Sequence, residues 1–189
     1  MLSCPHRETW SSTPPRATVP PALIPWLTDP SSLTARIRRR CGRFGVEVLC
    51  QGLGQAVRDE AVLLGLRAGE RVWVREVLLI ADGVPVVFAR SLLPRRHVRG
   101  AWNLFHGFGA HPLGAALFAD PAIERGPLAC TRLDARDARY HRARSVLSAR
   151  QPPMVPARGL WGRRSLFLRH GHALMVSEFF LPTIFELPR

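Results

Sequence analysis

Residues 71–94, RVWVREVLLIADGVPVVFARSLLP, carry the strongest structural signal in this chain, that of a long β-hairpin. Apolar residues fill it on both sides of Asp82-Gly83, a dipeptide that favours the two-residue turn of a β-hairpin. The segment RRSLFLRHGHALMVSEFFLP, residues 163–182, predicts a second hairpin that turns at His170-Gly171. A shorter strand is expected at residues 46–51, VEVLCQ. Long antiparallel strands are therefore expected at both ends of the core.

A first helix is expected at Leu33, because Ser31 or Ser32 can cap it and apolar residues then recur at every fourth position. The segment before it, residues 1–21, is rich in Pro, Ser and Thr and holds few large apolar groups. Such a segment cannot repay the entropy of ordering, so we predict a flexible tail. The remaining residues, 22–189, are expected to form one domain, which is the usual size for a single core.

Two more helical regions are expected between the hairpins. Residues 98–118 predict two short helices that are broken by Gly107 and Gly109, and the second opens at Pro112. The segment Thr131–Arg158 is rich in Arg and Ala, and its first part fits either a strand or a helix. Strands with helices between them predict an α+β domain, built on an antiparallel sheet with helices on one face.

The net charge of the chain indicates which classes of binding partner it favours. The 189 residues carry a formal net charge of +13, and all 27 basic residues are arginine. Such an excess favours nucleic acid, an anionic membrane or anionic small molecules, although a codon background rich in arginine would also produce it. Aromatic residues make up 8% and no known motif interleaves them with the charge, so we expect no nucleic-acid function. Peripheral contact with an anionic membrane is kept as a hypothesis.

The sequence also bears on compartment and cofactors. Its four cysteines are scattered and form no CxxC pair, so neither a zinc site nor a disulfide framework is indicated. The first residues lack the continuous apolar run of a signal peptide, and no apolar stretch is long enough to span a membrane. We therefore expect a cytoplasmic protein. Walker, GxGxxG and GxSxG motifs are absent from the sequence.

Two charged residues interrupt apolar strand faces. Strand alternation places Arg75 on one face with Val77, and Glu178 on one face with Val176. A buried charge is costly unless it is paired or functional. One hypothesis is therefore an internal ion pair between Arg75 and Glu178, or a sheet edge in water. The other is a pocket, in which the planar fork of Arg75 binds a carboxylate and Glu178 accepts a hydroxyl or takes a proton.

Other candidates have weaker support. Leu33 and Leu113 stand in the first turns of expected helices, where backbone N–H groups lack intrahelical partners and favour an anion, while their side chains fit a core role. The two histidines of the second hairpin turn, in HGH, have no third metal ligand nearby in the sequence, so we interpret them as a solvated turn. Arg163 and Arg164 are interpreted as a solvated strand end.

Four motifs together resemble one known family. The stretches WVREVLLIADGVP, HPLGAALF, LWGRRS and MVSEFFLP are similar to the bacterial chorismate lyases of ubiquinone biosynthesis. They occur in the order found in that family. With a weaker match at SSLTARI, the resemblance extends from about Trp26 to Pro182.

The resemblance implies a monomeric α+β enzyme with a six-stranded antiparallel sheet and a ligand enclosed beneath helical flaps. The reaction it implies converts chorismate to 4-hydroxybenzoate and pyruvate, without a metal or an organic cofactor. By position, Arg75 matches the arginine that binds the ring carboxylate, and Glu178 matches the glutamate that meets the ring hydroxyl. Leu113, and Leu33 where the family more often has methionine, match residues that bind through their backbone.

A non-catalytic alternative is a ligand-sensing domain, because effector-binding domains of some transcription regulators resemble the same fold. Such a regulator normally carries a winged-helix DNA-binding domain ahead of the sensor. Only a short polar segment precedes the core in this sequence. We therefore expect the enzyme.

Overall fold

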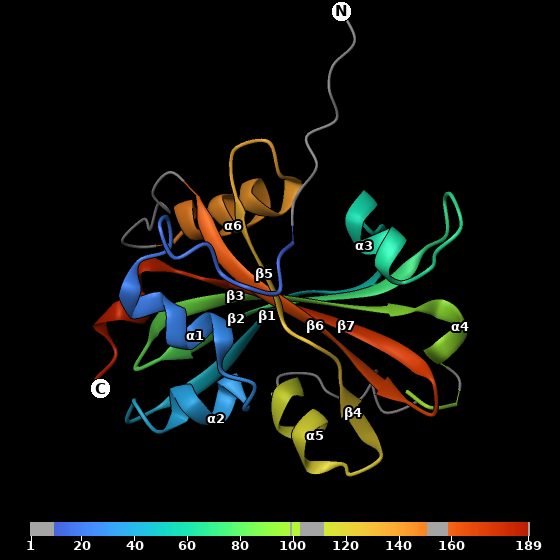
Figure 1. Ribbon diagram of the computed structural model, residues 1–189, viewed down its shortest axis with the longest axis horizontal. Helices are drawn as coiled ribbons and strands as arrows, with labels where there is room; N and C mark the ends of the chain where they lie inside the picture. The colour runs from blue at the N-terminus through green and yellow to red at the C-terminus, as the bar shows by residue number, and fades with distance from the viewer. Residues whose placement is uncertain (1–9, 99, 103–111, 151–158, 189) are drawn as a thin grey trace, which may run out of the picture.

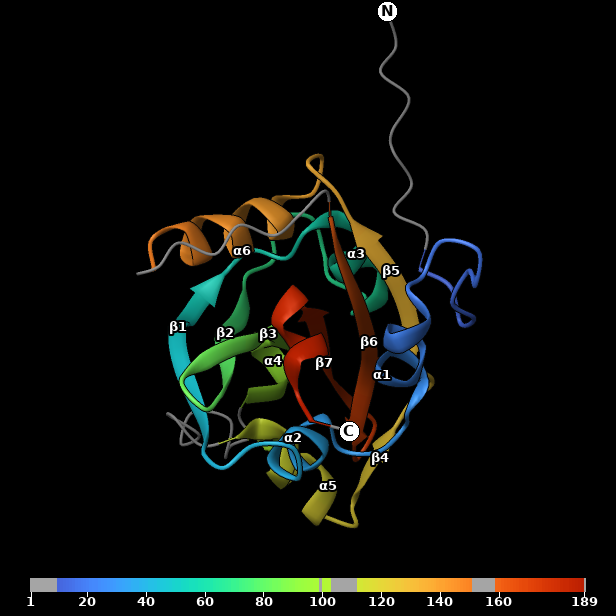
Figure 2. The same cartoon turned by 90° about the vertical axis from the view of Figure 1, so that its left-hand side faces the viewer.

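The computed structural model describes residues 10–98, 100–102, 112–150 and 159–188. Its centre is a seven-stranded antiparallel sheet in the order β1-β2-β3-β7-β6-β4, and β5 also pairs with β6 (Figure 1). The sheet is strongly curved, with β1 at one edge and β5 towards the other (Figure 2). The strands are β1 Phe44–Gly54, β2 Val72–Ala81, β3 Val84–Pro94, β4 Ile123–Arg125, β5 Ala129–Leu133, β6 Leu160–Arg169 and β7 His172–Phe180. Six strands were expected, and the three-residue β4 was not foreseen.

Both predicted hairpins are confirmed. Asp82 and Gly83 have φ values of 50° and 85° between β2 and β3, and His170 and Gly171 have values of 50° and 75° between β6 and β7. Two positive φ angles in a two-residue turn define the mirror-image turn that matches the twist of the strands. Because a two-residue turn sets the register of its hairpin, β6 and β7 pair residue for residue from Arg169 opposite His172 onward.

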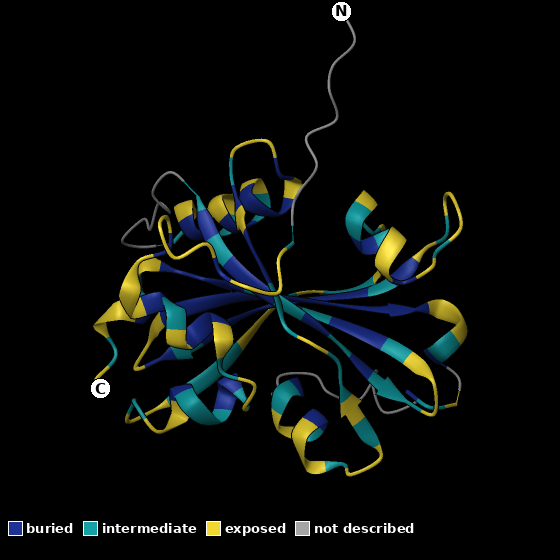
Figure 3. Cartoon of the chain, viewed as in Figure 1, coloured by how far each residue is buried: buried dark blue, intermediate teal, exposed yellow. Residues whose placement is uncertain are grey.

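Helices cover both faces of the sheet, whereas the sequence predicted helices on one face. We call the face that bears Arg75 and Glu178 the front face, and the face that bears Glu76 and Phe179 the back face. The front is covered by α1 (Ile24–Thr28), α2 (Leu33–Arg38) and α5 (Leu113–Ala119), and the back by α3 (Arg58–Leu63) and α6 (Ala138–Ser148) (Figures 1 and 3). The remaining short helices are η1 Pro21–Leu23, α4 Arg95–Val98 and η3 Pro182–Glu186. The prediction was wrong because both faces are apolar, and each must bury its side chains.

The helix starts follow their local sequence. Ser32 caps α2 by accepting a hydrogen bond from the backbone of Ala35 at 3.3 Å, as one of the two predicted caps. Pro112 is the N-cap of α5, and α6 begins after Asp137, in the segment that the sequence left open between strand and helix. The predicted helix break at Gly107 and Gly109 lies outside the described residues.

The described part of the predicted tail packs on the domain. Ser11 forms an antiparallel bridge with Cys130 of β5, and the Val19 side chain is 3% exposed within the front-face core. These contacts place part of residues 10–21 against the domain. The flexible tail at residues 1–21 and the domain at residues 22–189 stay predictions.

An ionic network holds the back-face helices to the sheet. Glu60 of α3 is fully buried and accepts a hydrogen bond from Arg90 of β3 at 3.0 Å. Arg90 also donates to Glu76 of β2 at 2.6 Å, and Arg139 of α6 lies 3.6 Å from Glu60. Burial alone would lower the pKa of Arg90, but Glu60 and Glu76 outweigh it and raise that pKa. The network therefore joins α3, α6 and the central strands. Removing one of its charges would leave a buried charge without a partner and destabilise the fold.

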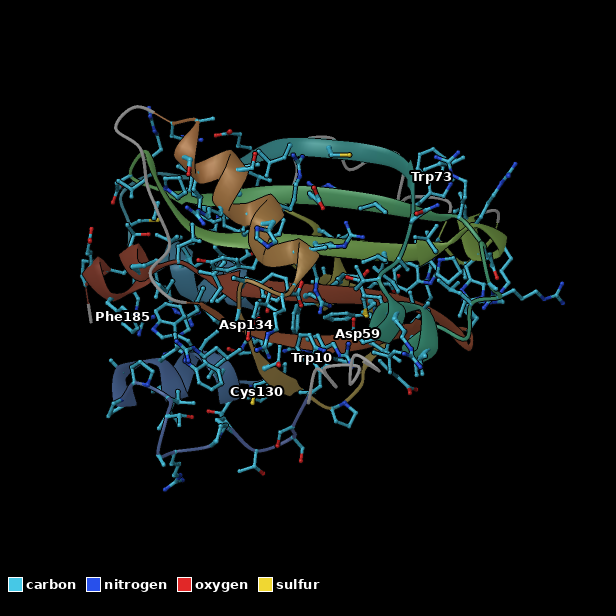
Figure 4. The ribbon with its side chains drawn as sticks, turned by 90° about the horizontal axis from the view of Figure 1, so that it is seen from above. Trp10, Asp59, Trp73, Cys130, Asp134 and Phe185 are labelled. Carbon is cyan, nitrogen blue, oxygen red and sulfur yellow. The ribbon has the colours of Figure 1, made fainter. Side chains whose placement is uncertain are left out.

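The N-terminal segment joins the same network. The indole of Trp10 donates to Asp59 of α3 at 2.7 Å, and Figure 4 shows the two side chains side by side. Arg164 of β6 donates to the same carboxylate at 2.5 Å, and its guanidinium stacks over the Trp10 ring at 4.0 Å. The interpretation of Arg164 as a solvated strand end was therefore wrong.

Candidate active site

A pocket lies on the front face, between the sheet and the first turns of α2 and α5. The floor comes from β2, β3, β6 and β7, whose inward side chains alternate with those of the back face. Most of the lining is apolar. The polar and charged side chains in it are Thr34, Arg75, Ser91, Arg125, Ser165 and Glu178.

All four residues that the sequence singled out line this pocket. Arg75 comes from β2 and Glu178 from β7, while Leu33 and Leu113 are the first residues of α2 and α5. The two leucines are 3% and 5% exposed and belong to the apolar cores, so their side chains fill the core role that was also expected. Residues far apart in the chain thus meet around one small volume.

Arg75 is a buried cation in the pocket wall. Arg75 is 2% exposed. In the sheet, it lies opposite Ser91 of β3 and Gln51 of β1. Burial lowers the pKa of Arg75, but the guanidinium stays protonated at any ordinary pH. A desolvated guanidinium beside a cavity favours an anionic ligand, because a carboxylate can take two parallel hydrogen bonds from it.

Glu178 forms an ion pair with a residue that the sequence analysis assigned elsewhere. Arg163 of β6 donates from Nε to Glu178 Oε2 at 2.6 Å. Arg163 is 1% exposed, and its other end donates to the backbone oxygens of Trp26 and Asp29 at 2.8 and 2.7 Å. The interpretation of Arg163 as a solvated strand end was therefore wrong. Arg163 fixes the Glu178 carboxylate and ties the α1 region to the sheet.

The hairpin register contained the signal for this pair. With a two-residue turn at His170-Gly171, counting back along β6 and forward along β7 sets Arg163 directly opposite Glu178. Facing residues on one face of an antiparallel pair lie close enough for opposite charges to interact. The alternative hypothesis named Arg75 as the partner of Glu178, but Arg163 is the arginine that pairs with it.

Sequence reasoning missed a second arginine in the pocket, Arg125 of β4. Its Nε donates to Ser165 of β6 at 2.8 Å, and one terminal nitrogen donates to the backbone oxygen of Pro30 at 2.5 Å. The guanidinium lies 5.4 Å from the ring centres of both Phe118 and Phe167. No sequence signal marked this residue, because β4 has only three residues and no alternating pattern.

The two helices above the pocket approach each other closely at Gly114. A Cβ at this position would lie 2.9 Å from Oγ1 of Thr34, which real Cβ contacts essentially never show. Gly114 is the second residue of α5 and Thr34 the second of α2. The absent side chain therefore lets the first turns of both helices meet over one pocket.

The described residues present no other obvious chemical centre. Within them, no group of three or more His, Cys, Asp or Glu side chains is placed to hold a metal ion. The histidines at positions 170 and 172 are exposed at the hairpin turn. None of the described helices is long and apolar enough to cross a membrane.

The fold and the pocket together define an α+β domain with a small pocket, lined by Arg75 and Arg125, on one face of an antiparallel sheet. The family model described as chorismate lyase matches residues 4–189, and the chain belongs to this family. A relative from Aromatoleum aromaticum, named probable chorismate pyruvate-lyase, is 65% identical over 184 residues, which cover 97% of both chains. A relative of the same name from an Azoarcus species is 61% identical over 184 residues, covering 96% of this chain and 94% of the relative.

A solved structure of an effector domain has the same fold. The effector domain of PhnF from Mycobacterium smegmatis superposes with a TM-score of 0.52 at 19% identity, covering 80% of this chain and 89% of that domain. At this identity the likeness concerns the fold alone.

Proposed function

We propose that this protein is a chorismate pyruvate-lyase that releases 4-hydroxybenzoate and pyruvate, at the entry to ubiquinone biosynthesis. The observation that carries this proposal is the 65% identity to a probable chorismate pyruvate-lyase over nearly the whole of both chains. The pocket supports it, because a buried arginine and a held glutamate line the same cavity.

Arg75 and two backbone groups bind the ring carboxylate in this proposal. The guanidinium supplies the charge, and the N–H groups of Leu33 and Leu113 complete the set of donors. Support comes from the position of each leucine as the first residue of its helix, where backbone N–H groups have no intrahelical acceptor. The close contact at Gly114 keeps the two first turns together.

Glu178 serves the opposite end of the ring. Oε2 of Glu178 accepts a hydrogen bond from Arg163 at 2.6 Å. Oε1 accepts none from the residues that the structure describes, so in this proposal it binds the ring hydroxyl. In the elimination, the proton on the hydroxyl-bearing carbon passes to Glu178 and the electrons of that C–H bond complete the aromatic ring. The neighbouring C–O bond breaks with its electron pair on oxygen. The enolpyruvate formed takes up a proton and becomes pyruvate.

For this reaction, the main contribution of the protein is to position the substrate. Aromatisation drives the elimination, so binding, orientation and one proton transfer are the contributions that the pocket has to make. We propose that no metal or organic cofactor takes part. We further propose that the protein is a monomer in the cytoplasm. Size-exclusion chromatography with light scattering should give a mass near 21.1 kDa.

Turnover of chorismate tests the proposed function. Purified protein should convert chorismate to equal amounts of 4-hydroxybenzoate and pyruvate. Chromatography measures the 4-hydroxybenzoate, and a coupled lactate dehydrogenase assay measures the pyruvate. Tight binding of 4-hydroxybenzoate without turnover of chorismate would instead fit a ligand-sensing domain. Absence of both binding and turnover would contradict the assignment of the pocket as well.

A further inference from the structure

We propose that Arg125 binds the second carboxylate of chorismate, on the enolpyruvyl group, and stabilises the enolpyruvate as it leaves. This inference rests on the proposed function, and it adds a substrate-binding residue for the part of the substrate that the product lacks. Three features of the pocket carry it: the hydrogen bonds of Arg125, the charge of the lining, and the place of Arg125 across the sheet.

The hydrogen bonds of Arg125 hold it in place and leave donors for a ligand. Nε is used by Ser165 and one terminal nitrogen by Pro30, while the second terminal nitrogen donates to no other described residue. The rings of Phe118 and Phe167 flank the guanidinium at 5.4 Å each, which restricts its rotation. Arg125 is therefore a preorganised cation in the lining of the pocket, and its second terminal nitrogen can donate hydrogen bonds to a ligand.

The charge of the lining matches a ligand with two negative charges. Arg163 neutralises Glu178, so this pair adds no net charge. Arg75 and Arg125 both line the pocket and give it two positive charges. Chorismate carries two carboxylates, whereas 4-hydroxybenzoate carries one. Arg75 accounts for the carboxylate that substrate and product share, which leaves Arg125 for the carboxylate that departs with pyruvate.

The two arginines approach the pocket from opposite sides. Arg75 lies in the same row of the sheet as Ser91, Val176 and Ser165, and Arg125 is bound to the last of these. Three strand spacings separate the ends of this row, roughly 14 Å between backbones, which leaves a small molecule between the side chains. The enolpyruvyl ether stands on the ring carbon next to the hydroxyl-bearing carbon, far from the ring carboxylate. A ring anchored at Arg75 therefore directs its ether group towards the Arg125 side.

This position also serves the breaking bond. As the C–O bond breaks, its electron pair stays on the ether oxygen and the leaving group gains a second negative charge as an enolate. A guanidinium that already holds the enolpyruvyl carboxylate lies close to this oxygen and stabilises the developing charge. The enolate then takes up the proton that left the ring and becomes pyruvate, so no oxidant, reductant or co-reactant is needed.

The test compares ligands with and without the second carboxylate. Arg125→Met keeps most of the side-chain volume and removes the charge. It should lower kcat/KM for chorismate by about 10- to 100-fold, the scale of a lost hydrogen bond between charged groups, and leave the Kd of 4-hydroxybenzoate within about threefold of the wild type. Arg36→Met is the matched control, because Arg36 binds the neighbouring part of the chain at Pro25 and Asp29 but does not line the pocket. It should leave both constants unchanged.

A binding measurement covers the case in which Arg125→Met does not fold. Arg125→Lys keeps a charge but loses the planar fork, and the ligand is 4-hydroxybenzoate with a carboxymethoxy group at the 3-position. This dicarboxylate should bind the variant at least about fivefold more weakly than the wild type, while 4-hydroxybenzoate binds both equally. If both ligands weaken together, or if kcat/KM for chorismate stays unchanged in a folded variant, Arg125 only holds the loop and the inference is overturned. Failure of the wild type to turn over chorismate would overturn the proposed function instead.

Discussion

Arg75 is expected to contribute affinity rather than stability, because it is a desolvated cation in a pocket wall. Arg75→Ala should keep the fold and weaken 4-hydroxybenzoate binding by about 1.5–3 kcal/mol, the value of a hydrogen bond to a charged group. Isothermal titration measures the affinity and thermal melting the fold. Arg71→Ala, which changes an exposed arginine just before the same strand, is the control and should bind the product normally. Equal product affinity in Arg75→Ala and the wild type would remove Arg75 from the site.

Glu178 is expected to affect turnover more than stability. Glu178→Gln keeps an oxygen that can accept the Arg163 hydrogen bond, but it removes the base and leaves the buried Arg163 charge without its counter-charge. We expect turnover to fall by about 100-fold or more, on the scale of general-base catalysis, with a smaller loss of melting temperature. A variant with wild-type kcat at a lowered melting temperature would show that Glu178 is only a structural partner of Arg163.

Some of these residues could be predicted from the sequence and others could not. Arg75 and Glu178 could be, because each places one charge in an apolar strand face. Arg163 could have been found from the predicted turn, since the register alone sets it opposite Glu178. Arg125 could not, because its role depends on how a three-residue strand reaches Ser165, forty positions away.

At the scale of elements, the meeting of α2 and α5 is expected to shape the pocket. Gly114→Ala would bring a methyl group within 2.9 Å of Thr34 Oγ1, so either the Thr34 side chain or the two helices must shift. We expect the Kd of 4-hydroxybenzoate to rise by about tenfold, because donors displaced by even about 1 Å lose much of their effect. The double variant Gly114→Ala with Thr34→Ala removes the clashing hydroxyl and should regain much of this affinity. Failure of the second change to restore binding would mean that the helix contact does not set the pocket.

Turn chemistry explains which elements the sequence could predict. Asp82-Gly83 and His170-Gly171 mark tight turns locally, so both hairpins were foreseen with their strands. The helices α1 and α3 were not foreseen, because neither begins with a side-chain cap such as the Ser32 cap that marks α2. At five and six residues, they take their stability from packing. The contacts of Ser11 with β5 and of Val19 with the front-face core likewise could not be predicted, because no local pattern encodes them.

In the whole molecule, the two faces of the sheet have different roles. The front face bears the pocket, and the back face bears the ionic network that stabilises the fold. Glu60 lies in the back-face network, so Glu60→Gln should cost about 3–5 kcal/mol in the free energy of unfolding, as for a broken buried ion pair. Denaturant unfolding measures this cost. Product affinity of the folded variant should be unchanged, because the pocket is on the other face. Glu47→Gln breaks the surface pair with Arg150 and should cost at most about 1 kcal/mol. Equal losses in the two variants would contradict this division.

The net charge of +13 leads to a prediction about location. We propose that the protein contacts anionic membrane surfaces peripherally, since each basic residue near such a surface contributes about 1 kcal/mol. Sedimentation with vesicles containing phosphatidylserine should pull down the protein at physiological salt, and neutral phosphatidylcholine vesicles should not. Protein that stays in the supernatant with both vesicle types would end this proposal.

A structure of the protein with bound 4-hydroxybenzoate would show whether the front-face pocket is the active site. We expect the ligand carboxylate to lie within hydrogen-bond distance of the Arg75 guanidinium and of the N–H groups of Leu33 and Leu113. We expect the ligand hydroxyl on the Glu178 carboxylate, with Arg163 still bound to the other oxygen. A ligand found elsewhere, such as in the groove beside Trp161 and Phe185, or one turned with its carboxylate towards Glu178, would show that the assignment of the active site is wrong.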